Sequence, residues 1–269
     1  VSKKIYLFLS FLICYITVWH ARTSAENLSI SFLLIGIGYL YSNHNNFNNF
    51  KLFLLGLIFG ASFVLRYNLG ISILFILLWF FFFTNKKRVL GILVILSGIL
   101  IINFFDIIAT SWAFDINFLN RQYFNSHFLN SNLNLSFILD RFPAYQFLIC
   151  GINNNYCGGG IWNVKPFLYY FYFIMIEFFP PFSLIILFSM IYFWFKNYKH
   201  VLVWATLPFF IIHSIIPHKE IRYIFPILAF SPYFISFFIE KLKNNILKSF
   251  IFKKLIIFFI VFNFAILIF

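Results

Sequence analysis

Acidic side chains are scarce in this 269-residue sequence, which has 7 Asp and Glu residues against 20 Lys and Arg residues. Charged residues of both signs make up only 10% of the chain, whereas hydrophobic residues make up 62% and aromatic residues 25%. The mean hydropathy of +0.92 lies far outside the range of soluble globular domains. No internal repeat or low-complexity linker stands out in the sequence. The composition therefore excludes a soluble globular protein and predicts a multi-pass membrane protein.

Cysteine is also rare, with 3 residues in the whole chain. Cys14 lies inside an apolar run, whereas Cys150 and Cys157 fall in the one long polar stretch. If that stretch faces an oxidising compartment, the last two cysteines are placed to form a disulfide. Two free thiols fit the sequence equally well, so the cysteines leave both states open.

The formal net charge of +13 raises the question of nucleic-acid binding. Most of the Lys and Arg residues, however, stand in short runs between apolar segments. The positive-inside rule of membrane proteins accounts for such runs. We therefore expect membrane lipids, and no nucleic acid, among the partners of this chain.

Apolar stretches divide the chain into about nine predicted spanning helices, since a span needs roughly 20 apolar residues and ~17 as a practical minimum. The predicted spans cover residues 5–19, 25–41, 52–65, 69–83, 89–105, 182–195, 201–216, 224–239 and 255–269. The first one resembles a signal peptide, but no small-residue cleavage site follows it, so we predict a spanning helix. The predicted fold class is an all-α polytopic integral membrane protein, with residues 1–269 in a single domain.

Basic residues concentrate in alternate connections between the predicted spans. The richer set comprises Lys3 and Lys4, the connection ending at Lys51, and residues 85–88, 196–200 and 241–254. By the positive-inside rule this set is cytoplasmic. The non-cytoplasmic side then holds residues 20–24, Arg66, one long loop at about 106–166 and residues 217–222.

An aromatic run at about 167–179 follows the long loop and ends at Pro180 and Pro181. Proline breaks helices, and the run is too short to span a bilayer. A further full span would also spoil the alternation of basic connections. We therefore predict a re-entrant or interfacial helix that carries Glu177.

The sequence PHKEIRYIFP, residues 217–226, places four ionisable side chains between two apolar segments. Snorkelling of basic side chains to lipid headgroups explains one or two such cations. It explains poorly a carboxylate, Glu220, that stands among His218, Lys219 and Arg222. Arg offers a bidentate fork and Lys a point charge for a phosphate, and the carboxylate would orient them. The pattern predicts a site at the membrane boundary for the head of a lipid-linked phosphate.

This stretch resembles the HKE-x-R-F signature of the α-mannosyltransferases that use dolichyl-phosphate mannose, with Tyr223 in place of Phe. These enzymes form glycosyltransferase family 22 of the GT-C superfamily. Earlier stretches are similar to the family in order and rough spacing, and they contain Arg22 with Thr23, then Arg66, and then Asp106, Trp112 and the tripeptide that begins at Asn117. The resemblance covers most of the chain and implies a GT-C-like fold.

The sequence departs from the family pattern in two places. The stretch CGGGIWNVKPFLYYF, residues 157–171, only loosely echoes the family's Tyr-Gly, Pro-Trp and aromatic series, which weakens any inference about acceptor recognition. The family also carries an acidic pair, which includes the expected catalytic base, in a loop before the Arg-Thr helix. Here the chain begins too close to Arg22 to supply that loop. With Val1 in place of Met, this leads us to expect an N-terminally truncated fragment whose activity alone is uncertain.

The resemblance implies transfer of a hexose, namely mannose, from a polyprenyl- or dolichyl-phosphate sugar to a glycan or glycolipid acceptor with inversion. A carboxylate takes the acceptor's proton, and cations stabilise the leaving phosphate. It implies donor-phosphate contacts by six residues: His218, Lys219, Glu220, Arg222, Arg66 and Arg22. It implies acceptor contacts by three: Asp106, Trp112 and Asn117. The catalytic base is unknown, although Asp115, Asp140 and Glu177 stand on the predicted side. No cofactor and no metal are implied.

Several of these residues have a plain structural alternative. Arg22 and Glu26 are one helical turn apart and suit a helix-end ion pair as well as a substrate contact. Arg66 suits snorkelling to headgroups. Asp106, at the predicted start of the long loop, suits a cap as well as an acceptor contact. The sequence leaves these pairs of interpretations open.

A lipid-linked glycan flippase or transporter is the alternative function, because it would also use cations at the interface to hold phosphate. Transporters commonly show repeated halves, which this sequence lacks, and the long loop favours an enzyme. A plain structural membrane protein would leave the cluster at 218–222 to chance. We expect a multi-pass protein of the bacterial cytoplasmic membrane or the eukaryotic endoplasmic reticulum, with the active face non-cytoplasmic.

Overall fold

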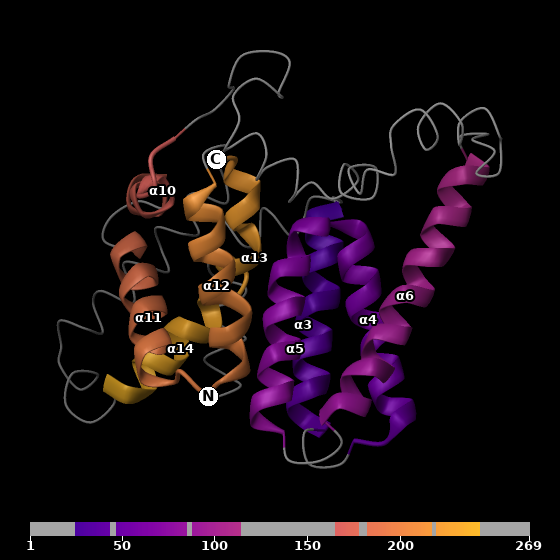
Figure 1. Ribbon diagram of the computed structural model, residues 1–269. Coiled ribbons are helices and arrows are strands. Elements are labelled where there is room, and N and C mark those ends of the chain that lie inside the picture. The colour runs from indigo at the N-terminus through magenta and orange to yellow at the C-terminus, as the bar shows by residue number, and fades with distance from the viewer. Residues whose placement is uncertain are drawn as a thin grey trace, which may run out of the picture. The chain divides into compact units, whose positions relative to one another are not determined.

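The computed structural model describes residues 25–43, 47–84, 88–113, 165–177, 182–216 and 219–242. Every regular element among these residues is a helix, as Figure 1 shows. They divide into two compact units, here named the N-terminal bundle, with α3 to α6, and the C-terminal bundle, with α10 to α14. For the described part of the chain, the predicted all-helical fold is confirmed.

The N-terminal bundle consists of α3 (Ala25–Asn43), α4 (Asn49–Leu65), α5 (Gly70–Phe83) and α6 (Arg88–Ala113), with a 3₁₀ turn, η1 (Tyr67–Leu69), between α4 and α5. Asn48 caps the start of α4, because its side chain accepts a hydrogen bond of 2.8 Å from the backbone N–H of Lys51. Ser62 donates from its hydroxyl to the carbonyl of Ser29 at 2.8 Å and so ties α4 to α3.

Helices α4 and α6 approach each other closely through glycine. A Cβ placed on Gly56 would lie 2.2 Å from the carbonyl oxygen of Ile95, and one on Gly98 would lie 2.6 Å from that of Phe53. Gly60 follows Gly56 at the four-residue spacing that lets helix backbones meet in membrane proteins. Only a residue without a side chain fits the two crossing points, so these glycines fix the α4–α6 packing.

The C-terminal bundle consists of α10 (Tyr169–Glu177), α11 (Phe182–Lys196), α12 (Val201–Ile215), α13 (Phe225–Leu228) and α14 (Ser231–Leu242), with a 3₁₀ turn, η3 (Ile221–Ile224), before α13. Its core is aromatic, and the buried ring of Phe193 lies 5.0 Å from that of Phe234 and 5.1 Å from that of Phe237, between ring centres. The indole N–H of Trp194 donates to the hydroxyl of Thr206 at 2.9 Å, which joins α11 to α12.

Two stretches among the described residues are long and apolar enough to cross a membrane, namely Arg88–Ala109 and Arg222–Lys241. Four shorter apolar helical stretches accompany them, and the helices α11 and α12 have 15 residues each. Such a helix rises only about 22 Å, which is less than the roughly 30 Å of a typical hydrocarbon core. The predicted spans from 25–41 to 201–216 each overlap one α-helix, and the span predicted at 224–239 is divided between η3, α13 and α14. The spans predicted at 5–19 and 255–269 lie outside the described residues.

Helix α6 extends past the point at which the long loop was predicted to begin. It continues to Ala113 and contains Asp106, which was expected to begin the loop. The stretch after Asp106 is apolar and free of Gly and Pro, so nothing ends the hydrogen-bond ladder there. Residues 114–164 of the predicted loop lie outside the described residues. Within the stretch 167–179, for which a re-entrant or interfacial helix was predicted, α10 covers Tyr169–Glu177.

Candidate functional site

Residues 219–223, which we call the signature segment, connect the end of α12 to α13 in the C-terminal bundle. Lys219 begins this segment with a side chain that is only 3% exposed. Its ammonium donates to the carbonyls of Ser214 at 2.6 Å and His213 at 3.4 Å. The last carbonyls of a helix lack partners within the helix and carry its negative dipole end, so a cation there is stabilising. Lys219 therefore fastens the signature segment to α12.

The ring of Tyr170, from α10, covers the same ammonium. The ammonium nitrogen of Lys219 lies 5.5 Å from the centre of that ring, which is within the range of a cation–π contact. Burial lowers the pKa of Lys219 below its usual 10.5. The sequence predicted that this ammonium contacts a phosphate, whereas in the structure it faces the end of α12 and the Tyr170 ring.

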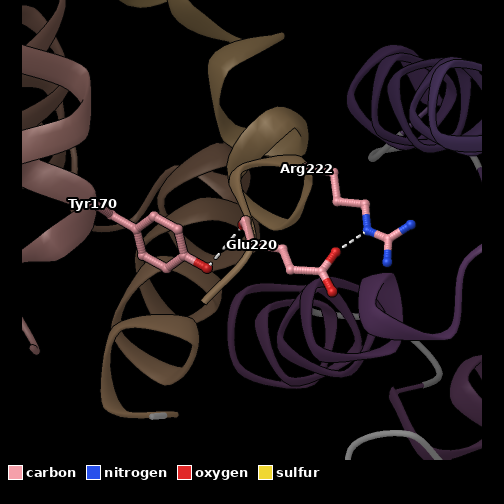
Figure 2. A network of polar contacts seen from close by, with 3 residues as sticks. All are labelled: Tyr170, Glu220 and Arg222. Atoms are coloured by element: carbon pink, nitrogen blue, oxygen red, sulfur yellow. Dashed lines mark hydrogen bonds and ion pairs between the residues drawn. The ribbon is translucent and has the colours of Figure 1, made fainter. Parts of the chain in front are cut away.

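Glu220 is held through its backbone. It is extended, with φ −116° and ψ 143°, and its carbonyl accepts hydrogen bonds of 3.1 Å from the Tyr170 hydroxyl and 3.1 Å from the N–H of Tyr223. Burial raises the pKa of Tyr170 above its usual 10, so the hydroxyl keeps its proton and donates. Figure 2 shows the Tyr170 hydroxyl directed at the backbone of Glu220.

The side chain of Glu220 points away from Tyr170 and forms an ion pair with Arg222, as Figure 2 also shows. The Arg222 side chain is 48% exposed and that of Glu220 is 25% exposed. The Glu220 carboxylate fixes the plane of the Arg222 guanidinium. It occupies only one edge of that group, because the ion pair is formed through Nε. The exposed remainder of the guanidinium stays accessible to a second anion.

Aromatic rings support the segment from the side of α12. The guanidinium of Arg222 lies 5.8 Å from the centre of the Tyr223 ring, and the rings of Tyr223 and His213 are 5.9 Å apart. His213 in turn stacks on Phe209 at 4.0 Å. The exposed guanidinium therefore lies against the half-buried Tyr223 ring, which contacts the buried ring of His213.

The signature segment can bind an anion through this arrangement. Lys219 and Arg222 contribute two positive charges and Glu220 one negative charge, which leaves a net +1 on these side chains. The part of that charge that solvent reaches is the Arg222 guanidinium. Among the residues that the structure describes, no group of three or more His, Cys, Asp and Glu side chains is placed to hold a metal ion.

The structure brings together Lys219, Glu220 and Arg222 in the C-terminal bundle. The other predicted site residues belong to the N-terminal bundle, to the end of α10 or to stretches outside the described range. Arg66 caps the C-terminal end of α4 and Asp106 lies within α6, and both are partly exposed residues of the N-terminal bundle. Trp112 is in the last turn of α6 and Glu177 is the last residue of α10. Five predicted residues lie outside the described range: Arg22, Asp115, Asn117, Asp140 and His218.

Sequence reasoning missed Tyr170 and His213. Tyr170 stands in an aromatic run where nothing distinguishes it from its neighbours, and His213 lies inside an apolar helix. The only sequence feature that could have drawn attention to His213 is its polar ring six residues before the signature segment.

Comparison with known protein families gives a match over nearly the whole chain. The model of the Alg9-like mannosyltransferase family matches residues 2–269. No curated protein and no solved structure matches the chain.

Proposed function

Because this chain belongs to the Alg9-like mannosyltransferase family, we propose that it transfers mannose from a polyprenyl- or dolichyl-phosphate carrier to a glycan or glycolipid acceptor. The family description supports a mannosyltransferase. The donor class rests on the signature segment and its surroundings, whereas the acceptor class rests on the family resemblance alone.

The observation that carries the proposal is the half-exposed Arg222 guanidinium on an otherwise anchored segment at the start of an apolar stretch. A lipid-linked sugar phosphate needs a cation for its head and apolar surface for its isoprenoid tail. Arg222 begins the Arg222–Lys241 stretch, which is long and apolar enough to cross a membrane. We infer that the phosphate head of such a donor binds at Arg222, where this stretch begins.

In the proposed reaction the acceptor hydroxyl oxygen attacks the anomeric carbon of the bound mannose. The bond from that carbon to the phosphate oxygen breaks, and its electrons leave with the phosphate. Because the hydroxyl attacks from the face opposite the phosphate, the anomeric configuration inverts. The hydroxyl proton passes to a carboxylate. Arg222 stabilises the negative charge that develops on the leaving phosphate, while Glu220 holds the guanidinium in place.

Lys219 supports this site from within. Its ammonium is bound to α12 carbonyls, so it contributes a fixed positive charge and a fixed backbone. His218, Arg66 and Arg22 remain proposed donor contacts, and Asp106, Trp112 and Asn117 remain proposed acceptor contacts. Candidates for the base are Asp115, Asp140 and Glu177. We further propose that the chain crosses the membrane about nine times, since each span needs roughly 20 apolar residues. The site would then lie on the non-cytoplasmic face.

The test uses membranes that contain the full chain and a polyprenyl-phosphate donor labelled with tritiated mannose. We expect label to appear in an acceptor glycolipid with the wild type. Arg222→Gln should lower the rate by about 10²-fold, the lower end for loss of one preorganised charge-stabilising group, since the guanidinium is half exposed. The transfer rate of Arg222→Lys should lie between those of the wild type and Arg222→Gln, because Lys keeps the positive charge but lacks the two-pronged guanidinium.

Arg88→Gln is the matched control, because Arg88 is an exposed arginine in the N-terminal bundle, on the predicted cytoplasmic side. It should transfer mannose at the wild-type rate. If the wild type moved the labelled donor across vesicle membranes without transferring mannose, the result would favour a flippase over a mannosyltransferase. Equal rates for wild type and Arg222→Gln would remove Arg222 from the mechanism.

A further inference from the structure

Tyr170 makes contacts that no part of the proposed reaction uses. Its side chain is 1% exposed, although a tyrosine hydroxyl is polar and α10 is a short helix of 9 residues. The hydroxyl donates to the Glu220 carbonyl at 3.1 Å, and the ring lies 5.5 Å from the Lys219 ammonium. One buried side chain from α10 thus contacts two consecutive residues of the signature segment.

The two contacts act at different atoms of the segment. The hydroxyl fixes the Glu220 carbonyl, which also accepts from the N–H of Tyr223 and so closes the turn that carries Arg222. The ring covers the ammonium that binds the end of α12. Backbone and ammonium together determine where the Glu220 carboxylate and its partner guanidinium stand.

We propose that Tyr170 is a positioning residue that sets the Glu220–Arg222 ion pair in the orientation that binds the phosphate of a lipid-linked substrate. Tyr170 does not touch the substrate and acts through the Glu220 carbonyl and the Lys219 ammonium. This inference rests on the proposed function for the identity of the anion. The mechanical part, that the Tyr170 hydroxyl orders the signature segment, stands on the contacts alone.

The chain offers matched variants for this test. Tyr170→Phe removes only the hydroxyl and keeps the ring over Lys219. Tyr170→Leu removes the hydroxyl and the ring. Tyr172→Phe is the control, because Tyr172 is on the same helix and its side chain is 63% exposed.

Binding is measured with purified full-length chain in lipid nanodiscs, using polyprenyl phosphate and the corresponding polyprenyl alcohol as probes. We expect Tyr170→Phe to weaken binding of the phosphate by about 3- to 10-fold, the range for one net hydrogen bond, and to leave the alcohol unchanged. Tyr170→Leu should weaken the phosphate further, and Tyr172→Phe should change neither. In an Arg222→Gln background Tyr170→Phe should add nothing, because the group that it positions is gone.

A general loss of folding would weaken phosphate and alcohol alike, and that result would overturn the positioning role. An undiminished effect of Tyr170→Phe in the Arg222→Gln background would overturn it as well. So would unchanged binding of the phosphate by Tyr170→Phe.

Amide hydrogen exchange separates this inference from the proposed function. Without any lipid, Tyr170→Phe should speed exchange in peptides that cover residues 219–223 several-fold, while Tyr172→Phe should not. If the wild type bound phosphate and alcohol equally, the proposed donor would fail, yet faster exchange in Tyr170→Phe alone would still support the ordering of the segment. Equal exchange in the two variants would overturn that ordering whatever the lipid results.

Discussion

Replacing Lys219 by Met distinguishes an anchoring ammonium from one that binds the substrate phosphate. Methionine is unbranched and fills a similar space, so the change removes the charge and its donors with little change in packing. In the structure the ammonium donates to two α12 carbonyls and lies against the Tyr170 ring. An anchor of this kind contributes to stability before any lipid arrives.

The contacts of Lys219 give the size of the effect. Buried carbonyls that lose their donor cost about 1–3 kcal/mol, and the ring contact adds about 0.5–1 kcal/mol. Burial disfavours the charged form of Lys219, as its lowered pKa indicates. Removing the charge therefore relieves this desolvation cost and offsets part of the free energy lost with the contacts. We expect a net loss of about 1–2 kcal/mol in the free energy of unfolding, or about 2–8 °C in the unfolding midpoint for a chain of this length.

The assay is thermal unfolding in detergent, followed by tryptophan fluorescence, with and without polyprenyl phosphate. Lys241→Met is the control, since Lys241 is an exposed lysine at the end of α14 and its loss should change stability by less than about 0.5 kcal/mol. If Lys219→Met were as stable as the wild type without lipid and failed to bind polyprenyl phosphate, the ammonium would act on the phosphate directly. The anchoring role would then be refuted.

Two further predictions concern the packing of each bundle. Gly56→Ala should lower the free energy of unfolding by about 1–3 kcal/mol, because the new Cβ would lie 2.2 Å from a backbone oxygen of α6. Gly38→Ala is the control: its Cβ meets nothing within 4 Å, so the unfolding midpoint should stay unchanged or rise. Equal changes in the midpoint for the two variants would contradict the close α4–α6 crossing. Burial lowers the pKa of His200 to about 4 from its usual 6.5, so its contribution to stability is complete above pH 6.5 and is lost as the pH falls toward 4, by at most about 3 kcal/mol. His200→Asn keeps an acceptor for the N–H of Leu202 and removes the titrating group. Between pH 6.5 and 4 the unfolding midpoint of this variant should therefore fall less than that of the wild type. If the two midpoints fell in parallel with pH, the burial of His200 would be contradicted.

The helices of this chain were predictable from runs of apolar residues, because long apolar runs indicate segments that are buried in a membrane or in an apolar core. Residues 182–195 and 201–216 were predicted as spans, and α11 and α12 occupy nearly the same positions. The end of α6 was not predictable in this way. A charge ends an apolar run but does not break a helix, so Asp106 ended the predicted span while the helix went on to Ala113.

Only the part of the candidate site that consists of residues close together in the sequence was predictable. Lys219, Glu220 and Arg222 lie within one turn of chain, so their proximity follows from the sequence alone. The directions of their side chains do not, because burial decides that the ammonium faces α12 while the guanidinium faces outward. Tyr170 joins Glu220 across 50 residues of chain, and no periodic pattern singles out one of 15 tyrosines.

The most direct test of the central claim is photo-crosslinking with a polyprenyl phosphate that carries a photoreactive group next to the phosphate. The label, mapped by mass spectrometry on the full chain, should fall on peptides that contain Arg222 and should disappear in competition with unlabelled polyprenyl phosphate but not with polyprenyl alcohol. Label that is absent from residues 219–224 and competed equally by phosphate and alcohol would contradict the account.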